Sequence, residues 1–194
     1  MKRHASLLLT AALLALTACG HTPAPRYYVL SGPPLASDAA ARQGPRLGLG
    51  PITLPSYLDR PQIVTRASAT ELALAQEHRW AEPLNVSFAR ALQAELLHRL
   101  PASDVVLHPW SSSSGVARQV SVDVLRFERD VDGRFVLGAR WTVQTPGGEP
   151  RPAPHTSEIA LPAGQDDYAA LVAAANGAVA TLAEQIVTAL GAAP

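Results

Sequence analysis

The sequence predicts an α/β domain of the layered α+β type, in which a largely antiparallel or mixed sheet packs against two main helices. Residues 118–130 and 135–144 alternate apolar and polar positions on either side of a turn signal, as the two strands of a hairpin do. Residues 83–100 and 165–190 instead repeat apolar positions every three or four residues, which is typical of amphipathic helices. Strands and helices that each carry an apolar side must bury it against one another.

Short strands separated by proline-rich turns fill the first half of the domain. Residues 27–30 (Tyr-Tyr-Val-Leu) favour a strand, and residues 35–45 read as a loop. Residues 47–52 form a second strand, whose glycines indicate a bulge or a close approach of the backbone. Residues 62–66 form a third strand, with which residues 71–75 can pair through a short turn.

The helix of residues 83–100 is bracketed by prolines. Pro83 lies where the first turn of a helix tolerates proline, and Pro101 ends the helix. One face carries the apolar side chains of Leu84, Phe88, Ala91, Leu92, Leu96 and Leu100. A short strand at residues 105–107 and a serine-rich loop at residues 111–115 follow.

The second half of the domain holds the hairpin and the last helix. The alternation in residues 118–130 changes phase at Leu125, which predicts a bulge or burial on both faces. Asp132-Gly133 is the turn signal, and residues 156–161 return as one more strand. The many alanines of residues 165–190 permit close packing of the last helix against the sheet.

The N-terminus carries a signal for secretion and lipidation. Lys2-Arg3 precedes an apolar run that is shorter than the ~20 residues needed to span a bilayer. Leu16-Thr17-Ala18-Cys19 then matches the bacterial lipobox, in which a peptidase cuts before an acylated cysteine. Each buried methylene of the acyl chains contributes about 0.8 kcal/mol, so two or more chains give stable anchoring. We therefore expect lipid attachment at Cys19.

This signal also predicts location and organisation. Because Gly20 stands where an aspartate would retain a lipoprotein in the inner membrane, we expect the periplasmic face of the outer membrane. The expected layout is a signal peptide at residues 1–18, a lipidated tether at residues 19–26 and a single domain at residues 27–194. Cys19 is the only cysteine, so its acylation leaves no thiol for a disulfide, a metal or catalysis.

Composition and motifs argue against chemistry. The 16 basic residues balance the 16 acidic ones, which gives no sign of nucleic-acid binding. Glu95-x-x-His98 has the spacing of half a di-iron site, but the second half is missing. Asp166-Asp167 reads as a helix N-cap and not as an acid–base pair. We expect no enzyme, and no catalytic residue, cofactor or metal site.

Two segments present residues that packing does not obviously require. One is a proline-bracketed turn with an aromatic residue and an arginine, and the other is an Arg-Trp pair just before the first long helix. Such residues anchor many protein interfaces. The interface candidates are Tyr57, Leu58, Arg60, Pro61, Arg79 and Trp80. A purely structural reading, in which Trp80 staples onto Pro83 and Leu84, stays open.

The same segments carry a family resemblance. The lipobox, Tyr-Tyr-Val-Leu at residues 27–30, Pro-Ser-Tyr-Leu-Asp-Arg-Pro-Gln-Ile-Val at residues 55–64 and Arg-Trp-Ala-Glu-Pro-Leu at residues 79–84 follow one another in this order. The chain resembles the PqiC-like family over essentially its whole mature length. Members of this family are also described as auxiliary lipoproteins of ABC-type transport systems and as subunits of membrane integrity-associated transporters.

The resemblance implies a non-catalytic docking subunit of an MCE-type intermembrane lipid transport system that supports envelope integrity. Its implied partners are an MCE-domain periplasmic protein with its inner-membrane partners, and further copies of the chain in a homo-oligomer; phospholipid is a further candidate. Two alternatives stay open. The chain can be an assembly or activator lipoprotein of another envelope machine, such as a peptidoglycan synthase or an outer-membrane insertion complex. The other alternative is a lipid-anchored hydrolase with an unfamiliar site.

Overall fold

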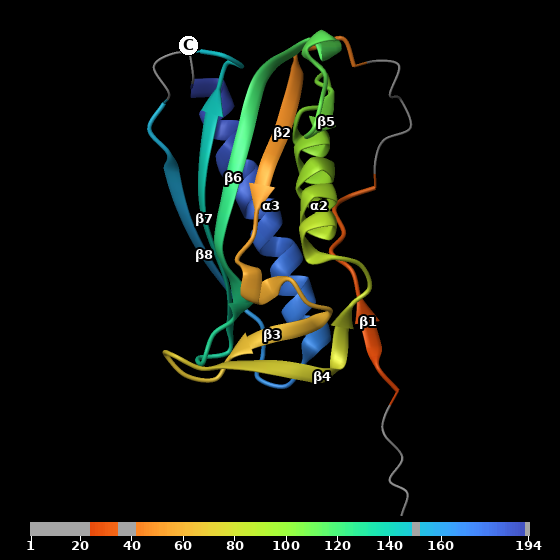
Figure 1. The fold of residues 1–194 in the computed structure, drawn as a ribbon, viewed down its shortest axis with the longest axis vertical. Coiled ribbons are helices and arrows are strands. Elements are labelled where there is room, and N and C mark those ends of the chain that lie inside the picture. The colour runs from red at the N-terminus through yellow and green to blue at the C-terminus, as the bar shows by residue number, and fades with distance from the viewer. Residues whose placement is uncertain (1–23, 35–41, 149–151, 193–194) are drawn as a thin grey trace, which may run out of the picture.

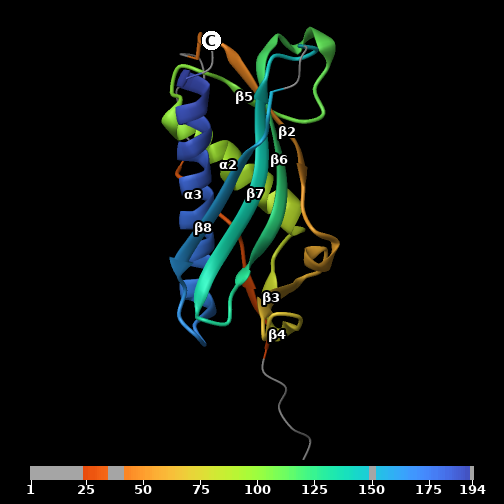
Figure 2. The ribbon, with the colours of Figure 1, turned by 90° about the vertical axis from the view of Figure 1, so that its left-hand side faces the viewer.

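The computed structural model describes residues 24–34, 42–148 and 152–192, and the predictions for the signal peptide and Cys19 concern residues outside these ranges. In chain order, its elements are β1 (Arg26–Tyr28), β2 (Arg46–Thr53), the 3₁₀ turn η2 (Ser56–Leu58), β3 (Gln62–Arg66), β4 (Leu72–Trp80), α2 (Leu84–Arg99), β5 (Val105–Leu107), the 3₁₀ turn η3 (Ser112–Ser114), β6 (Val116–Arg129), β7 (Arg134–Gln144), β8 (His155–Pro162) and α3 (Tyr168–Ala192). Figures 1 and 2 show a twisted sheet with both helices on one of its sides, which confirms the predicted class.

The sheet is mixed and forks at β6. Along one side β6 pairs with β7, which in turn pairs with β8, and both pairings are antiparallel. On its other side β6 first runs parallel to β2 and then meets β3 at a single position, Thr65 opposite Arg129. One branch therefore continues from β2 to β5, and the other from β3 through β4 to β1. The second branch crosses the long strands at a steep angle in Figure 1.

The phase change predicted at Leu125 is a bulge. The register of β6 and β7 shifts between Val124 and Arg126, and the side chain of Leu125 is 42% exposed there. Beyond the bulge, Phe127 and Glu128 are both buried although neighbours in a strand point to opposite faces. Both predicted alternatives, a bulge and burial on both faces, are therefore found.

The helices close the core from one side. α3 packs on β7 and β8, while α2 packs on α3, β5 and β2. One hydrophobic cluster extends from Leu30 to Ile186, with Phe88, Leu137 and Leu182 fully buried in it. By length and composition α3 can cross a membrane, but half of it is buried inside this fold. Core packing accounts for its hydropathy.

Caps and turns follow the sequence signals. The Oδ1 atom of Asp167 accepts hydrogen bonds from the amides of Ala169 and Ala170 (2.8 and 3.1 Å), so this residue caps α3 as predicted. Gly133 adopts a φ of +76° in the turn between β6 and β7, a conformation that glycine reaches at little cost. Gly48 serves close packing, because a Cβ atom at this position would lie 2.7 Å from the ring of Trp110.

Candidate functional site

The two segments with interface candidates lie side by side in the structure. We call residues 54–61 the Tyr57 turn and residues 79–84 the Trp80 segment. The amide of Trp80 donates a hydrogen bond to the carbonyl oxygen of Pro61 (2.7 Å), and Gln62 pairs with Arg79 across β3 and β4. The turn itself closes through hydrogen bonds from the amides of Leu58 and Asp59 to the carbonyls of Pro55 and Ser56 (3.0 and 3.1 Å). Strings that are about 20 residues apart thus form one surface region.

The candidates differ in exposure. Leu58 and Trp80 are only 3% and 5% exposed, and the Trp80 ring packs against Phe127 with 6.4 Å between ring centroids. Tyr57 and Arg79 are half-buried, whereas Arg60 and Pro61 are exposed. The buried pair therefore supports this surface from below, and Arg60 and Pro61 are its solvent-accessible residues. Contact of any of these residues with a partner stays a prediction.

Arg60 is notable among the exposed candidates. Its guanidinium makes no ion pair or hydrogen bond with any residue in the described ranges. Pro61 follows it directly and fixes the backbone there at a φ of about −65°. The rigid backbone of the turn limits the backbone freedom that is lost when an acidic group binds here, and the remaining cost is the ordering of the Arg60 side chain.

A groove separates the Tyr57 turn from the first half of α2. One part, of about 330 Å³, is lined on the turn side by Leu54, Pro55 and Asp59 and on the helix side by Leu84 and Asn85. A second part, of about 370 Å³, shares Ile52 and Asn85 with the first and continues past Val86, Ala89 and Arg90 to His108.

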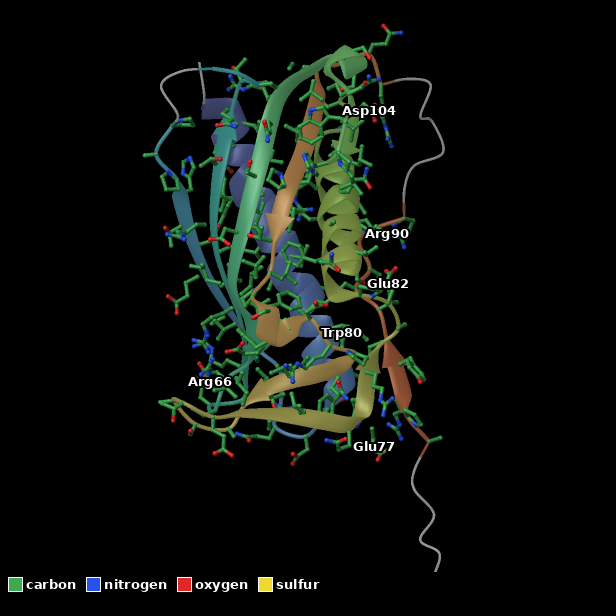
Figure 3. The ribbon with its side chains drawn as sticks, in the orientation of Figure 1. Arg66, Glu77, Trp80, Glu82, Arg90 and Asp104 are labelled. Carbon is green, nitrogen blue, oxygen red and sulfur yellow. The ribbon has the colours of Figure 1, made fainter. Side chains whose placement is uncertain are left out.

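The groove has few charges. Arg90 forms an exposed ion pair with Glu82 (2.8 Å), and Figure 3 shows both residues on the outer side of α2. Asp59 lines the part next to the Tyr57 turn. The rest of the lining is apolar or uncharged polar, together with the imidazole ring of His108. A groove with few charges that runs between a turn and a helix can receive a segment of another protein.

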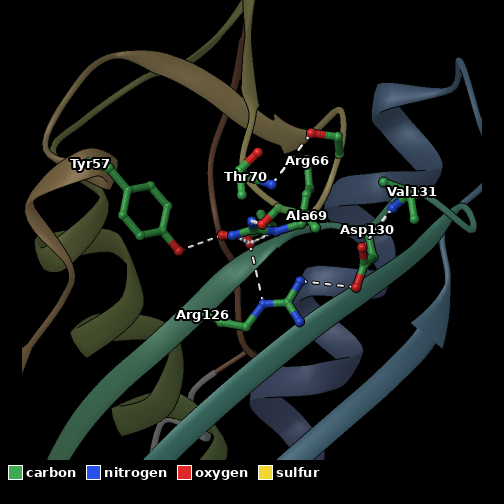
Figure 4. A network of polar contacts seen from close by, with 9 residues as sticks. Tyr57, Arg66, Ala69, Thr70, Arg126, Asp130 and Val131 are labelled. Carbon is green, nitrogen blue, oxygen red and sulfur yellow. Dashed lines mark hydrogen bonds and ion pairs between the residues drawn. The ribbon is translucent and has the colours of Figure 1, made fainter.

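Below the groove, a buried glutamate organises a cluster of charges. We call Tyr57, Arg66, Arg126, Glu128 and Asp130 the Glu128 cluster (Figure 4). Arg66 donates to Oε1 of Glu128 from Nε and Nη2 (2.8 and 2.6 Å), and Nε of Arg126 donates to the same oxygen (3.3 Å). The Tyr57 hydroxyl donates to Oε2. Glu128 is 0% exposed, so these donors replace the water that its carboxylate has lost.

The Glu128 cluster joins three parts of the fold. Arg126 also donates to Oδ2 of Asp130 (3.0 Å), at the turn between β6 and β7. Nη1 of Arg66 donates to the carbonyl of Ala69 (3.1 Å), in the turn between β3 and β4. Together with Tyr57 on η2, these contacts fix the Tyr57 turn and the branch of β3 and β4 against β6.

The electrostatics of the cluster favour a structural role. Burial, and after it the hydrogen bond and charge of Glu128, raise the pKa of Tyr57, so its hydroxyl stays protonated and keeps donating. The amide of Val131 and then Arg126 lower the pKa of Asp130. Among the described residues, every buried side-chain nitrogen or oxygen has a hydrogen-bond partner. Both carboxylate oxygens of Glu128 are thus engaged in hydrogen bonds with side chains of the fold.

The structure also places the groups considered for metal or acid–base chemistry. Glu95 is buried and forms an ion pair with Arg99, while His98 is exposed. Within the described part of the chain, no three His, Asp or Glu side chains gather as possible metal ligands. Asp167 is engaged as the cap of α3.

The Glu128 cluster was not predicted from the sequence. Arg126-x-Glu128-x-Asp130 is an alternating charged run inside a strand, which ordinarily indicates a face open to water. The signal that distinguishes it is the phase change at Leu125 just before it. A charged run that follows such a change can face a second layer, here the branch of β3 and β4.

The fold defines the general class of protein first. A crystal structure of an uncharacterised protein superposes with a TM-score of 0.71 at 22% identity, covering 87% of this chain and 99% of its own. A crystal structure of a Xanthomonas campestris protein gives a TM-score of 0.62 at 20% identity, covering 84% of this chain and 92% of its own. The chain is therefore an α+β protein whose mixed sheet and two helices form an already observed fold.

Sequence comparison then gives the family. The family described as ABC-type transport auxiliary lipoprotein component matches residues 28–187, and this chain belongs to it. The chain is similar to the intermembrane transport lipoprotein PqiC of Escherichia coli K12, with 28% identity over 142 residues that cover 72% of this chain and 74% of the relative. The PqiC of Shigella flexneri matches with the same figures. The PqiC-like resemblance of the motif strings is thereby confirmed.

Proposed function

We propose that this protein is a non-catalytic docking subunit of an MCE-type intermembrane lipid transport system, anchored in the outer membrane through lipid on Cys19 and facing the periplasm. The observation that carries the proposal is the family match over residues 28–187, which begins shortly after a lipobox. Membership makes the chain an auxiliary lipoprotein of a transport system. The printed name of the E. coli relative, an intermembrane transport lipoprotein, supports the more specific role.

The groove between the Tyr57 turn and α2 is the surface that we assign to docking. Residues of both motif strings, among them Asp59 and Leu84, line its first part. The Tyr57 turn, which forms one wall there, also carries Arg60, whose guanidinium has no partner among the described residues. The Glu128 cluster holds this turn in place from inside. We propose that a segment of the MCE-domain protein binds in the groove and that an acidic residue of that segment pairs with Arg60.

Anchoring is tested first, in cells that express the full chain with a C-terminal affinity tag. Metabolic labelling with a palmitate analogue is expected to mark the protein, and a Cys19→Ser variant is expected to lose the label and leave the membrane fraction. A Gly20→Asp variant keeps the thiol and serves as the matched control. It is expected to keep the label but to move to the inner membrane in density fractionation. Labelling of the Cys19→Ser variant would contradict the anchor.

Docking is tested by affinity purification from solubilised membranes. We expect an MCE-domain protein to co-purify with the full chain and an Arg60→Glu variant to lose most of it. Arg134→Glu is the control, because Arg134 is also exposed but lies at the start of β7 and lines neither part of the groove. Recovery of a peptidoglycan synthase or an outer-membrane insertion complex without any MCE-domain protein would overturn the proposal. Equal losses in the two variants would overturn the assignment of the groove.

A further inference from the structure

Several elements gather at the end of the molecule where the described chain begins. Figures 1 and 2 both place β1, β3, β4 and the turn between β6 and β7 at this end, together with the start of α3. The same views place β5, η3 and the end of α3 at the opposite end. We call the first of these the tether end, because Ala24 and Pro25 lead into β1 there.

Exposed apolar side chains concentrate on the elements of the tether end. Tyr27 on β1 is 62% exposed, Leu74 on β4 is 38% exposed, and Val131 in the turn between β6 and β7 is 55% exposed. Val29, just after β1, is also exposed. Of the large apolar residues that are exposed in the described ranges, only Leu125, in the bulge of β6, lies elsewhere. Elements distant in the sequence thus present apolar groups at one end.

We propose that the tether end lies on the lipid bilayer, with Tyr27, Leu74 and Val131 in contact with the headgroup region. This inference rests on the proposed acylation of Cys19 and adds an orientation to it. The chain from Cys19 to Arg26 has seven peptide steps, so it reaches at most about 25 Å when fully extended. Such a short tether keeps β1 close to the bilayer, and aromatic residues such as Tyr27 favour the membrane interface.

β1 is fixed to the domain, so the chain ahead of it always leaves from the end of the molecule that carries these exposed apolar residues. The hydroxyl of Tyr28 and Nδ1 of His78 are 2.8 Å apart and hydrogen-bonded. The His78 ring stacks on Tyr168 at the start of α3, with 3.8 Å between centroids. Because neighbours in a strand point to opposite sides, the side chain of Tyr27 is directed away from this stack, in agreement with its exposure.

The charges of the tether end favour apolar contact over electrostatic attraction. Exposed acidic residues lie on its loops, at Glu71, Asp132, Asp166 and Asp167. Exposed arginines, at Arg26 and Arg134, accompany them. No cationic patch therefore distinguishes this end, and we expect its contact with lipid to depend little on anionic lipid or on salt.

The test uses the full lipidated chain in vesicles of phosphatidylethanolamine and phosphatidylglycerol. Acylated Cys19 has no free thiol, so a single introduced cysteine is the only site for a thiol-reactive, environment-sensitive fluorophore. Leu74→Cys and Val131→Cys report on the tether end. Ser113→Cys is the matched control, because Ser113 is exposed on η3 at the opposite end. Flotation of the vesicles shows whether each protein is anchored.

We expect the labels at positions 74 and 131 to shift their emission to the blue and to be quenched by lipids that carry a quencher in the headgroup region. The label at position 113 is expected to show neither effect. Floated protein in which all three labels behave alike would overturn the orientation and leave the anchor intact. Protein that does not float would overturn both, because three side chains cannot hold a domain on a bilayer without acyl chains.

Discussion

Phe127 and Glu128 are neighbours on β6, and the two faces that they occupy are buried in different ways. Phe127 lies on the helix side, with ring centroids 5.5 Å from Phe88 and 4.7 Å from Phe135. Glu128 lies on the other side and is neutralised by Arg66 and Arg126. Further up β6, that second side is open to solvent, where Asp123 and Arg140 form an exposed pair. The aromatic face buries apolar surface, an interaction that has no preferred direction. The charged face instead requires specific hydrogen bonds, and these fix the position of the branch of β3 and β4 that covers it.

The largest effect is expected on the aromatic face. A Phe127→Ala change removes a ring that is 2% exposed and leaves a cavity, so we expect the free energy of unfolding to fall by about 3–5 kcal/mol. Urea denaturation measures it. Leu125→Ala, two residues away in the exposed bulge, is the control and should cost less than about 1 kcal/mol. Similar losses at the two positions would mean that the cluster of aromatic rings does not hold the core together.

A smaller loss in the free energy of unfolding is expected from a change on the charged face, and it should also loosen the Tyr57 turn. Glu128→Gln keeps the shape but leaves Arg66 and Arg126 without their buried carboxylate, so we expect a loss of about 3 kcal/mol. The control is Asp123→Asn, whose pair with Arg140 is exposed and should contribute less than about 1 kcal/mol. We also expect proteases to cleave the Tyr57 turn faster in the Glu128→Gln variant. In the Phe127→Ala variant, this turn should not be a preferred cleavage site. Equal losses in the Glu128→Gln and Asp123→Asn variants would contradict a buried charge at β6.

The smallest effect concerns pH and separates the two faces by their response to acid. The folded-state pKa of Asp130 lies below its ordinary value of 3.8. The stabilisation by its carboxylate is therefore fully present above that value and is lost as the pH falls through the folded-state pKa. Between about pH 6 and about pH 3, the midpoint temperature of thermal unfolding should therefore fall less for the Asp130→Asn variant than for the protein without this substitution. The Phe127→Ala variant should show the same dependence of the unfolding midpoint on pH as the protein without the substitution. A weaker dependence in that variant would contradict the assignment of the acid response to the charged face.

Local patterns predicted the individual elements well. β3 has the predicted bounds, and α2 begins one residue after Pro83 because this proline serves as the residue that precedes the first helical turn. β4 was expected to end near Ala75 but continues to Trp80. Its pairing with β3 jumps from Val64 opposite Leu74 to Gln62 opposite Arg79, and such an irregular stretch has no simple alternation to recognise.

Tertiary arrangement was harder to predict than the elements. The alternation of residues 118–130 indicated a strand, but no local signal showed that β2 and β3 would share one side of it. Four pairings among the described strands are parallel, two of them at this fork, and each joins segments that are distant in the sequence. The Glu128 cluster depends on the same fork. For the candidate site, the motif strings identified the right segments, but the sequence did not show that Leu58 and Trp80 are buried while Arg60 is exposed.

The parallel pairing of β1 with β4 has a mechanical consequence. Arg26, Tyr27 and Tyr28 lie opposite His78, Arg79 and Trp80, and the amide of Ala81 donates to the carbonyl of Tyr28 (2.7 Å). A pull on the chain ahead of Arg26 acts along the strand, so these hydrogen bonds bear the load together in shear and do not open one at a time. From β4 the force passes through Trp80 into the aromatic rings of the core. Tension on the chain ahead of Arg26 would thus reach the core through β4 and the buried Trp80.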